Sequence, residues 1–291
     1  MKKVLFILAA AATAMILFSC EKTGKKEPKV YETPIYENLA AKYEVETATS
    51  LISGIRSFEV TNAGVYVIEK NDKVISGKFE KESVNNGKAV LNLRGFGKVT
   101  ILDANITKAD ANVTITFEPE VGSPIIVLAE PVAPTVSASS DVMAKLNRAW
   151  KVTATELVIS DFKISKTFEN GCDIPAILKY LEDKIDGFKA DKDYTGYVVK
   201  DLSITDNSII VRFTGADALS APLTIGANLD FSYKVSGSQV GNPIFNGEAS
   251  GKVAFDKWNE PVVTIAAKIN DKNGKEYNGS VKFYLSETEV L

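Results

Sequence analysis

The chain has 291 residues, of which 45% are hydrophobic and 24% are charged, and its formal net charge is −3. This composition describes a globular protein with one large or two modest cores, and the mildly acidic balance argues against nucleic acid as a partner. The absence of histidine from the sequence excludes Ser-His-Asp and Cys-His catalytic groups, an imidazole general base and His-ligated zinc.

Residues 1–19 have the pattern of a secretory signal peptide. Lys2 and Lys3 precede an apolar run from Val4 to Phe18, and a small residue follows this run. The run is shorter than the roughly 18 apolar residues that a membrane-spanning helix needs. Removal of residues 1–19 lowers Lys+Arg from 34 to 32 against 37 Asp+Glu, so the net charge becomes −5.

The segment Leu17-Phe18-Ser19-Cys20 resembles the lipobox of bacterial lipoproteins. The resemblance implies lipid attachment at Cys20, with more than one acyl chain for stable anchoring; the alternative is an ordinary signal peptide with an incidental cysteine. Glu21 differs from the Asp that retains such lipoproteins in the inner membrane, which implies the outer membrane and leaves the side open. Residues 20–34 are expected to be the lipidated cysteine and a flexible tether.

Most of the mature chain alternates apolar and polar residues with a period of two, which is typical of half-buried antiparallel strands. Asn- and Gly-rich turns separate these runs. We therefore predict a mainly β fold of two antiparallel β-domains, each a barrel or a sandwich, over residues 35–128 and 142–291. Residues 129–141, rich in Pro, Ser and Ala, are the predicted linker. The alternating residues are Phe58 and Val60; Val65 and Val67; Leu91 and Leu93; Val99 and Ile101; Val113, Ile115 and Phe117; Leu202 and Ile204; Ile209, Val211 and Phe213; Leu229, Phe231, Tyr233 and Val235; Val253 and Phe255; Ala267 and Ile269; and Val281, Phe283 and Leu285.

One helix is predicted inside the second domain. Asp173 can cap it, Pro175 is acceptable in its first turn, and Gly187 can end it. The helical spacing is carried by Ile174, Ile177, Leu178, Leu181 and Ile185. We expect this helix to lie against a sheet or to plug one end of a barrel.

The two halves show corresponding patterns. Residues 39–45 and 146–152 share Leu-x-x-x-aromatic-x-Val, and residues 58–67 resemble residues 202–211. The larger offset of the second pair matches the length of the segment that carries Cys172 and the predicted helix. The second half is thus either the plan of the first plus a helical insertion, or a generic repetition of strand–turn–strand patterns.

The segment Leu146–Val152, with Trp150, resembles the opening strand of lipocalin-like domains, although Arg148 stands where the lipocalin signature has glycine. A short helical turn is predicted just before it, over Val142–Leu146, capped by Ser140 or Asp141. Gly171-Cys172-Asp173 before a helix is similar to lipocalin-like lipoproteins of the Bacteroidetes. The resemblance covers mainly residues 141–291 and implies a lipocalin-like barrel with a binding role.

Three other motifs are interpreted as structure. Arg94-Gly95-Phe96-Gly97 resembles an RNA-binding pattern but lacks its later aromatic residues, so a strand-connecting turn is expected. Asp271–Glu276 departs from the calcium-loop spacing and is expected to be a hairpin turn, and Asp191 and Asp193 are interpreted as a solvated turn. Cys172 is a buried apolar residue or a spare thiol, with burial favoured. We expect no catalytic residues, no metal and no cofactor.

The leading functional hypothesis is a non-catalytic lipoprotein that binds a small apolar molecule or a partner protein. The first alternative is a glycan-binding accessory protein of a polysaccharide-uptake system, for which Tyr194, Tyr197, Trp258 and Tyr277 are candidate stacking residues. The second is a structural or assembly subunit, which predicts an unpaired edge strand. An enclosed apolar cavity would favour the first hypothesis.

Overall fold

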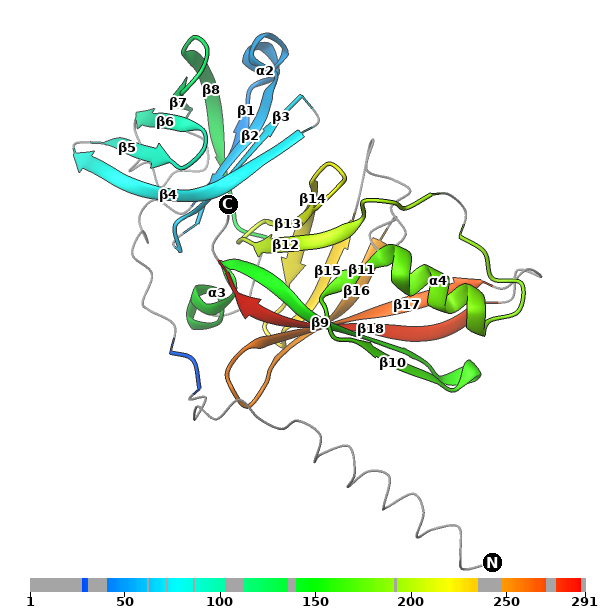
Figure 1. The fold of residues 1–291 in the computed structure, drawn as a ribbon. Helices are drawn as coiled ribbons and strands as arrows, with labels where there is room; N and C mark the ends of the chain where they lie inside the picture. Colours follow the sequence, from blue (N-terminus) through cyan, green and yellow to red (C-terminus); the bar gives the residue numbers. More distant parts are fainter. Residues whose placement is uncertain are drawn as a thin grey trace, which may run out of the picture.

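The computed structural model describes residues 28–30, 41–61, 63–71, 73–85, 87–102, 112–135, 140–190, 193–234, 248–270 and 276–288. Over these residues the chain forms two antiparallel β-barrels, each closed by eight strands (Figure 1). The predicted mainly β fold with two antiparallel β-domains is confirmed, and both domains are barrels. Cys20 and the predicted signal peptide lie outside the described residues.

The first barrel is a simple up-and-down arrangement in which each strand pairs with the next. Its last strand returns to the first, with Tyr43 opposite Pro131 and Val45 opposite Ala129, and this pairing closes the barrel. Its elements are β1 (Ala41–Val45), α2 (Thr47–Ser53), β2 (Ile55–Val60), β3 (Val65–Lys70), β4 (Lys73–Asn85), β5 (Lys88–Leu93), β6 (Gly97–Leu102), β7 (Val113–Pro119) and β8 (Ile125–Val132).

The alternating residues of β7 show how this barrel is filled. Val113, Ile115 and Phe117 point inward and are essentially inaccessible. The ring of Phe117 meets that of Phe58 from β2 edge to face, with centroids 5.4 Å apart. Because successive side chains of a strand point to opposite faces, the period-two pattern alone places these residues in one core.

The second barrel closes through its first strand, β9, whose Trp150 lies opposite Leu202 of β12. One edge of β9 pairs with β18; the other pairs with β12 near its start and with β10 near its end. The barrel strands are β9 (Ala149–Ile159), β12 (Val198–Ile204), β13 (Ser208–Phe213), β14 (Leu219–Ile225), β15 (Asp230–Lys234), β16 (Glu248–Phe255), β17 (Pro261–Asn270) and β18 (Glu276–Glu287). The remaining elements of this half are α3 (Ser140–Leu146), η1 (Ser160–Phe162), β10 (Ile164–Phe168), β11 (Cys172–Asp173) and α4 (Ile174–Lys184).

The predicted helix is α4. Its N-terminal cap is as expected, whereas its C-cap is Ile185 and not the predicted Gly187. The Asp173 carboxylate accepts a hydrogen bond from the Ala176 amide at 2.9 Å, and a proline occupies the first turn. Ile174, Ile177 and Leu181 are buried in the core of the second barrel. The helix ends at Lys184, and Gly187 follows in a turn with a φ of 77°.

The short helix predicted before Trp150 is α3. Trp150 is fully buried, and its indole N–H donates to the Leu146 carbonyl at the end of α3, at 3.0 Å. Trp150 thus links the first strand of the second barrel to α3.

The two barrels share one plan, which agrees with the corresponding sequence patterns. The related segments form β1 and β9, and the second related pair forms the hairpins β2–β3 and β12–β13. The second barrel carries η1, β10, β11 and α4 at the position where the first barrel has only α2. A common origin by duplication stays a prediction.

These two hairpins pack against each other and form a seam between the barrels. Tyr66 and Ile68 of β3 fill the first barrel, whereas Val65 and Val67 are buried on the opposite, outward face, where Val65 contacts Ala149 of the second barrel. The alternation in the sequence places Val65 and Val67 on one face of β3, and the neighbouring barrel buries that outward face.

The linker begins later than the predicted residues 129–141. Pairing with β1 extends β8 to Val132, which lies opposite Lys42. Thr135 is bound to the second barrel: its amide donates to the Asn207 side chain at 3.2 Å, and its hydroxyl donates to the Leu223 carbonyl at 2.6 Å. These bonds hold the connection against the second barrel.

Candidate binding sites

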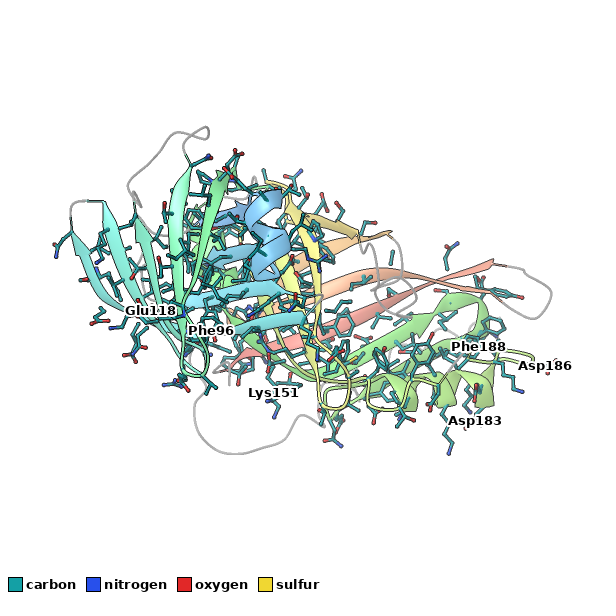
Figure 2. The ribbon with its side chains drawn as sticks, turned by 90° about the horizontal axis from the view of Figure 1, so that it is seen from above. Phe96, Glu118, Lys151, Asp183, Asp186 and Phe188 are labelled. Carbon is teal, nitrogen blue, oxygen red and sulfur yellow. The ribbon has the colours of Figure 1, made fainter. Side chains whose placement is uncertain are left out.

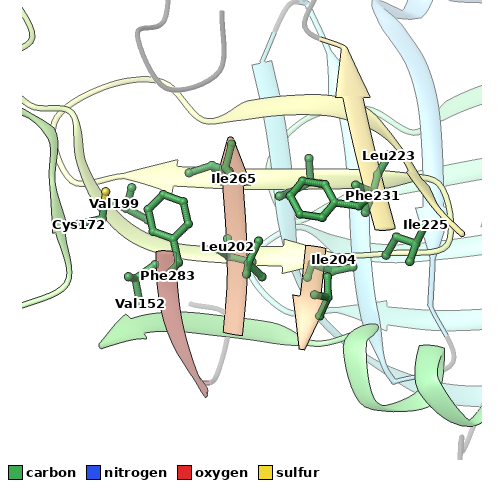
Figure 3. Close-up of a pocket in the computed structure, with 14 residues that line it drawn as sticks. Val152, Cys172, Val199, Leu202, Ile204, Leu223, Ile225, Phe231, Ile265 and Phe283 are labelled. Atoms are coloured by element: carbon green, nitrogen blue, oxygen red, sulfur yellow. The ribbon is translucent and has the colours of Figure 1, made fainter. Parts of the chain in front are cut away.

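A cavity inside the second barrel is lined by apolar side chains (Figure 3). Its lining includes Val152, Cys172, Leu202, Phe231, Ile265 and Phe283, which come from strands all around the barrel. The free space open to the centre of a water-sized sphere is only about 30 Å³. Sites for small molecules usually enclose about 300–1,000 Å³. The interior is therefore a packed core with a small residual cavity.

Cys172 is part of this core. Its side chain is 1% exposed, as predicted, and burial raises the pKa of the thiol to about 12. Because only the thiolate is a good nucleophile, this thiol is chemically inert at neutral pH. Cys172 thus contributes packing.

Three of the four candidate stacking residues pack against other aromatic rings of the protein. Tyr194 is buried and meets Tyr197 at 5.7 Å between centroids, and Tyr197 in turn meets Phe213 at 5.1 Å. Tyr277 packs on Phe162 with centroids 4.4 Å apart.

Trp258, the fourth candidate, is half-buried in the turn between β16 and β17. Trp258 precedes the start of β17, whereas Tyr277 lies opposite Ile269 near the other end of that strand. The rings therefore do not form the exposed line that a glycan-binding face would present.

The Arg94–Gly97 motif forms the expected turn between β5 and β6. Phe96 is 9% exposed and packs edge to face on Phe117 at 6.0 Å. Its backbone carbonyl accepts from the Glu120 amide at 2.8 Å, near Glu118 (Figure 2). This ring is part of the core and is not available to stack on a base.

A different surface is apolar and accessible: the outer face of β6, β7 and β8. Strand register arranges it in two rows, Leu102–Thr114–Leu128 and Thr100–Thr116–Ile126. Ile126 is 65% exposed and Leu128 is 39% exposed. The six outward positions carry no charge, and charged residues border them: Lys88 of β5 lies opposite Leu102, and Lys98 lies opposite Glu118 in the next row. The exposed Glu130 follows Leu128 on the same face of β8. Sequence periodicity could have identified these outward residues, but not their exposure.

Helix α2 extends this apolar surface. The Leu128 carbonyl accepts hydrogen bonds from the Glu46 amide at 2.9 Å and the Thr49 hydroxyl at 3.4 Å, which places α2 next to β8. Leu51 is 83% exposed and Ile52 is 91% exposed. We call these residues, together with the two rows, the Leu128 face. Exposed contiguous apolar surface of this kind is typical of interaction sites.

The seam between the barrels contains buried charged groups. Glu59 of β2 is 3% exposed, and its side chain hydrogen-bonds with Thr205, Asn207 and Ser208 of the second barrel. Burial raises the pKa of this carboxyl to about 7, although those hydrogen bonds and Lys42 act in the opposite direction. The seam thus combines these buried polar contacts with the apolar contact between Val65 and Ala149.

Arg212 of β13 also crosses this seam. It pairs with the buried Asp201, donates to the Ser76 hydroxyl of the first barrel, and reaches the Ser203 hydroxyl at 3.0 Å. These bonds join the two barrels at a second point.

Within the described residues, no group of three acidic or cysteine side chains is arranged to hold a metal ion. The carboxylate of Asp193 accepts hydrogen bonds from the amide and the hydroxyl of Thr195, at 2.8 and 2.7 Å. Asp191 and residues 271–275 lie outside the described residues. The described part of the chain also contains no helix long and apolar enough to cross a membrane.

No protein-family model and no curated protein matches the chain. Among solved structures, it is similar to transferrin binding protein B from Haemophilus parasuis, with 12% identity and a TM-score of 0.26, covering 85% of this chain and 45% of that one. For the intact Ap-TbpB with N and C lobes the values are 14%, 0.22, 86% and 46%. For the Neisseria meningitidis protein they are 16%, 0.23, 86% and 44%.

The chain therefore spans about half the length of these structures.

Proposed function

We propose that this chain is a lipid-anchored, non-catalytic binding protein of the outer membrane that binds a partner protein at its Leu128 face. The lipobox-like segment ending at Cys20 supports the anchor. The lack of histidine in the sequence and the burial of the Cys172 thiol support a non-catalytic role. The resemblance to lipocalin-like lipoproteins of the Bacteroidetes is in keeping with such a role.

The observation that carries the proposal is the uncharged character of the Leu128 face. Cores of protein interfaces are depleted of charged residues, whereas ordinary exposed sheet faces carry many. Ile126 and Ile52 each present most of their side chain to solvent. The expected partner has an apolar, uncharged surface of its own that covers both strand rows.

Other occupants have weaker support. A small apolar ligand would need more room than the cavity of about 30 Å³ offers. A glycan-binding face would need the exposed aromatic rings that are here engaged in packing. Assembly through an edge strand is disfavoured because β10 is short and exposes Lys166.

A crosslinking experiment tests the partner site. A photo-crosslinking amino acid replaces Ile126 in cells, and the matched control replaces Glu80, which is exposed on β4 of the same barrel, two strands away from β6. We expect one dominant adduct from position 126 and none from position 80. Leu51→Asp with Ile52→Asp should weaken binding by at least about 2 kcal/mol, roughly thirty-fold. Equal or absent adducts at the two positions contradict the proposal. An adduct between two copies of this chain would show that the face binds a second copy and not a different protein.

The anchor is tested separately. The chain with Cys20→Ala should lose incorporation of labelled fatty acid and should no longer float with membranes. Retention of the label in this variant would exclude lipidation at Cys20.

A further inference from the structure

Residues 28–30 lie against one end of the second barrel, although they precede the first barrel in the sequence. The Lys29 amide donates to the Trp258 carbonyl at 2.9 Å, and the Asn259 side chain donates to the Lys29 carbonyl at 2.8 Å. The Lys29 ammonium also pairs with Glu287 of β18 at 3.1 Å. Two hydrogen bonds thus attach the segment before the first barrel to the turn between β16 and β17, and one ion pair attaches it to β18.

This attachment limits where a membrane anchor can be. Lys29 is nine residues after Cys20, and nine residues span at most about 30 Å even when fully extended. A lipid on Cys20 therefore keeps the Trp258 end of the second barrel near the bilayer. Residues 28–30 lie at the lower side of the described molecule in Figure 1, whereas α2 lies at its top. The Leu128 face, which includes α2, then lies away from the membrane.

The side chains at the attached end suit a lipid surface. Trp258 is half-buried, and the ammonium of the exposed Lys257 lies 5.0 Å from its ring centroid. Lys145 of α3 lies over the Phe255 ring at 5.3 Å. Tryptophan and lysine are the residues that favour the headgroup region of a bilayer.

Three acidic groups at this end are held by hydrogen bonds within the protein. Asp256 accepts the amides of Trp258 and Glu260, at 2.8 and 2.9 Å. Glu260 is 9% exposed and accepts from the Ser286 hydroxyl, and Glu287 pairs with both Arg148 and Lys29. Asp141 in the first turn of α3 is exposed. The cations available to headgroups are the exposed Lys257 and, in the preceding sequence, Lys22, Lys25 and Lys26.

We propose that this end, defined by Lys29, Lys145, Lys257 and Trp258 and called here the Trp258 end, rests on the anionic headgroups of the membrane that holds the anchor. The proposal depends on the lipid anchor at Cys20. It sets the orientation of the protein: the second barrel lies next to the membrane and the Leu128 face of the first barrel points away from it.

The two tryptophans of the chain make a direct test possible. Trp150 is fully buried in the second barrel, whereas Trp258 is at the proposed contact. The lipidated full chain is reconstituted in vesicles that contain an anionic lipid and a lipid brominated near its headgroup, which quenches tryptophan on contact. We expect quenching of the wild-type emission and no quenching in the Trp258→Phe variant, where only Trp150 remains.

A second pair of variants tests the charge. Lys145→Ala with Lys257→Ala should weaken the contact with anionic vesicles by roughly five-fold per lysine, and quenching should fall accordingly. Lys88→Ala on the first barrel is the control and should leave quenching unchanged.

The outcomes separate the two proposals. Protein that floats with the vesicles while Trp258 stays unquenched overturns the orientation and leaves the anchor standing. Protein that does not float overturns the anchor, and the orientation with it. Equal quenching in the lysine pair and in Lys88→Ala overturns the anionic headgroup contact.

Discussion

Glu59→Gln should make the free energy of unfolding less dependent on pH. Glu59 is buried in the seam between the barrels, and burial raises the pKa of its carboxyl from 4.5 to about 7. Since one pKa unit corresponds to 1.36 kcal/mol, ionised Glu59 costs the folded protein about 3 kcal/mol. The folded state binds this proton more tightly than the unfolded state. The protonated Glu59 carboxyl therefore contributes stability that is fully present below the pKa of the unfolded state and is lost as the pH rises through about 7.

Denaturant unfolding of both proteins measures this effect. At about pH 5 the wild type and the glutamine variant should be similarly stable, because Glu59 is largely protonated in the folded protein. At about pH 8 the variant should be more stable by up to about 3 kcal/mol, less any loss from poorer hydrogen bonding to Thr205, Asn207 and Ser208.

The difference between the two proteins at each pH isolates Glu59, because the other titrating groups cancel. Glu44→Gln, at an exposed carboxylate of β1, controls for removal of a negative charge from the same barrel. A stability difference that stays constant from about pH 5 to about pH 8 would refute the argument. In that case Glu59 would not change protonation in the seam over this range.

Three further outcomes are expected. Arg212→Met should destabilise the protein by about 3 kcal/mol, because it leaves the buried Asp201 without its charged partner; a loss below about 1 kcal/mol in denaturant titrations would show that solvent replaces the ion pair. Residues 21–291, purified from the periplasm, should give an apo mass in native mass spectrometry, since the second barrel has a cavity of only about 30 Å³; an apolar species bound at unit stoichiometry would contradict the packed interior. Cys172 should react with a thiol reagent only after unfolding, because burial raises its pKa to about 12; rapid labelling of the native protein would show that the core opens.

Much of the fold was readable from local sequence. Alternation in Val113, Ile115 and Phe117 identifies an inward face because strand geometry has a period of two. Asp173 and the residue spacing after it define the start and the buried side of α4. The strand plan of both barrels and the insertion in the second are also visible in the two corresponding sequence patterns.

Only the tertiary structure decided what covers each outward face, because that depends on residues far apart in the chain. Val65 and Ile126 both stand on outward faces of the first barrel, yet Val65 is buried against the second barrel while Ile126 is 65% exposed. The same packing buries Glu59, which no local pattern distinguishes from an exposed strand carboxylate. Local periodicity specifies which side chains share a face, whereas the docking of one barrel on the other determines which faces remain available for binding.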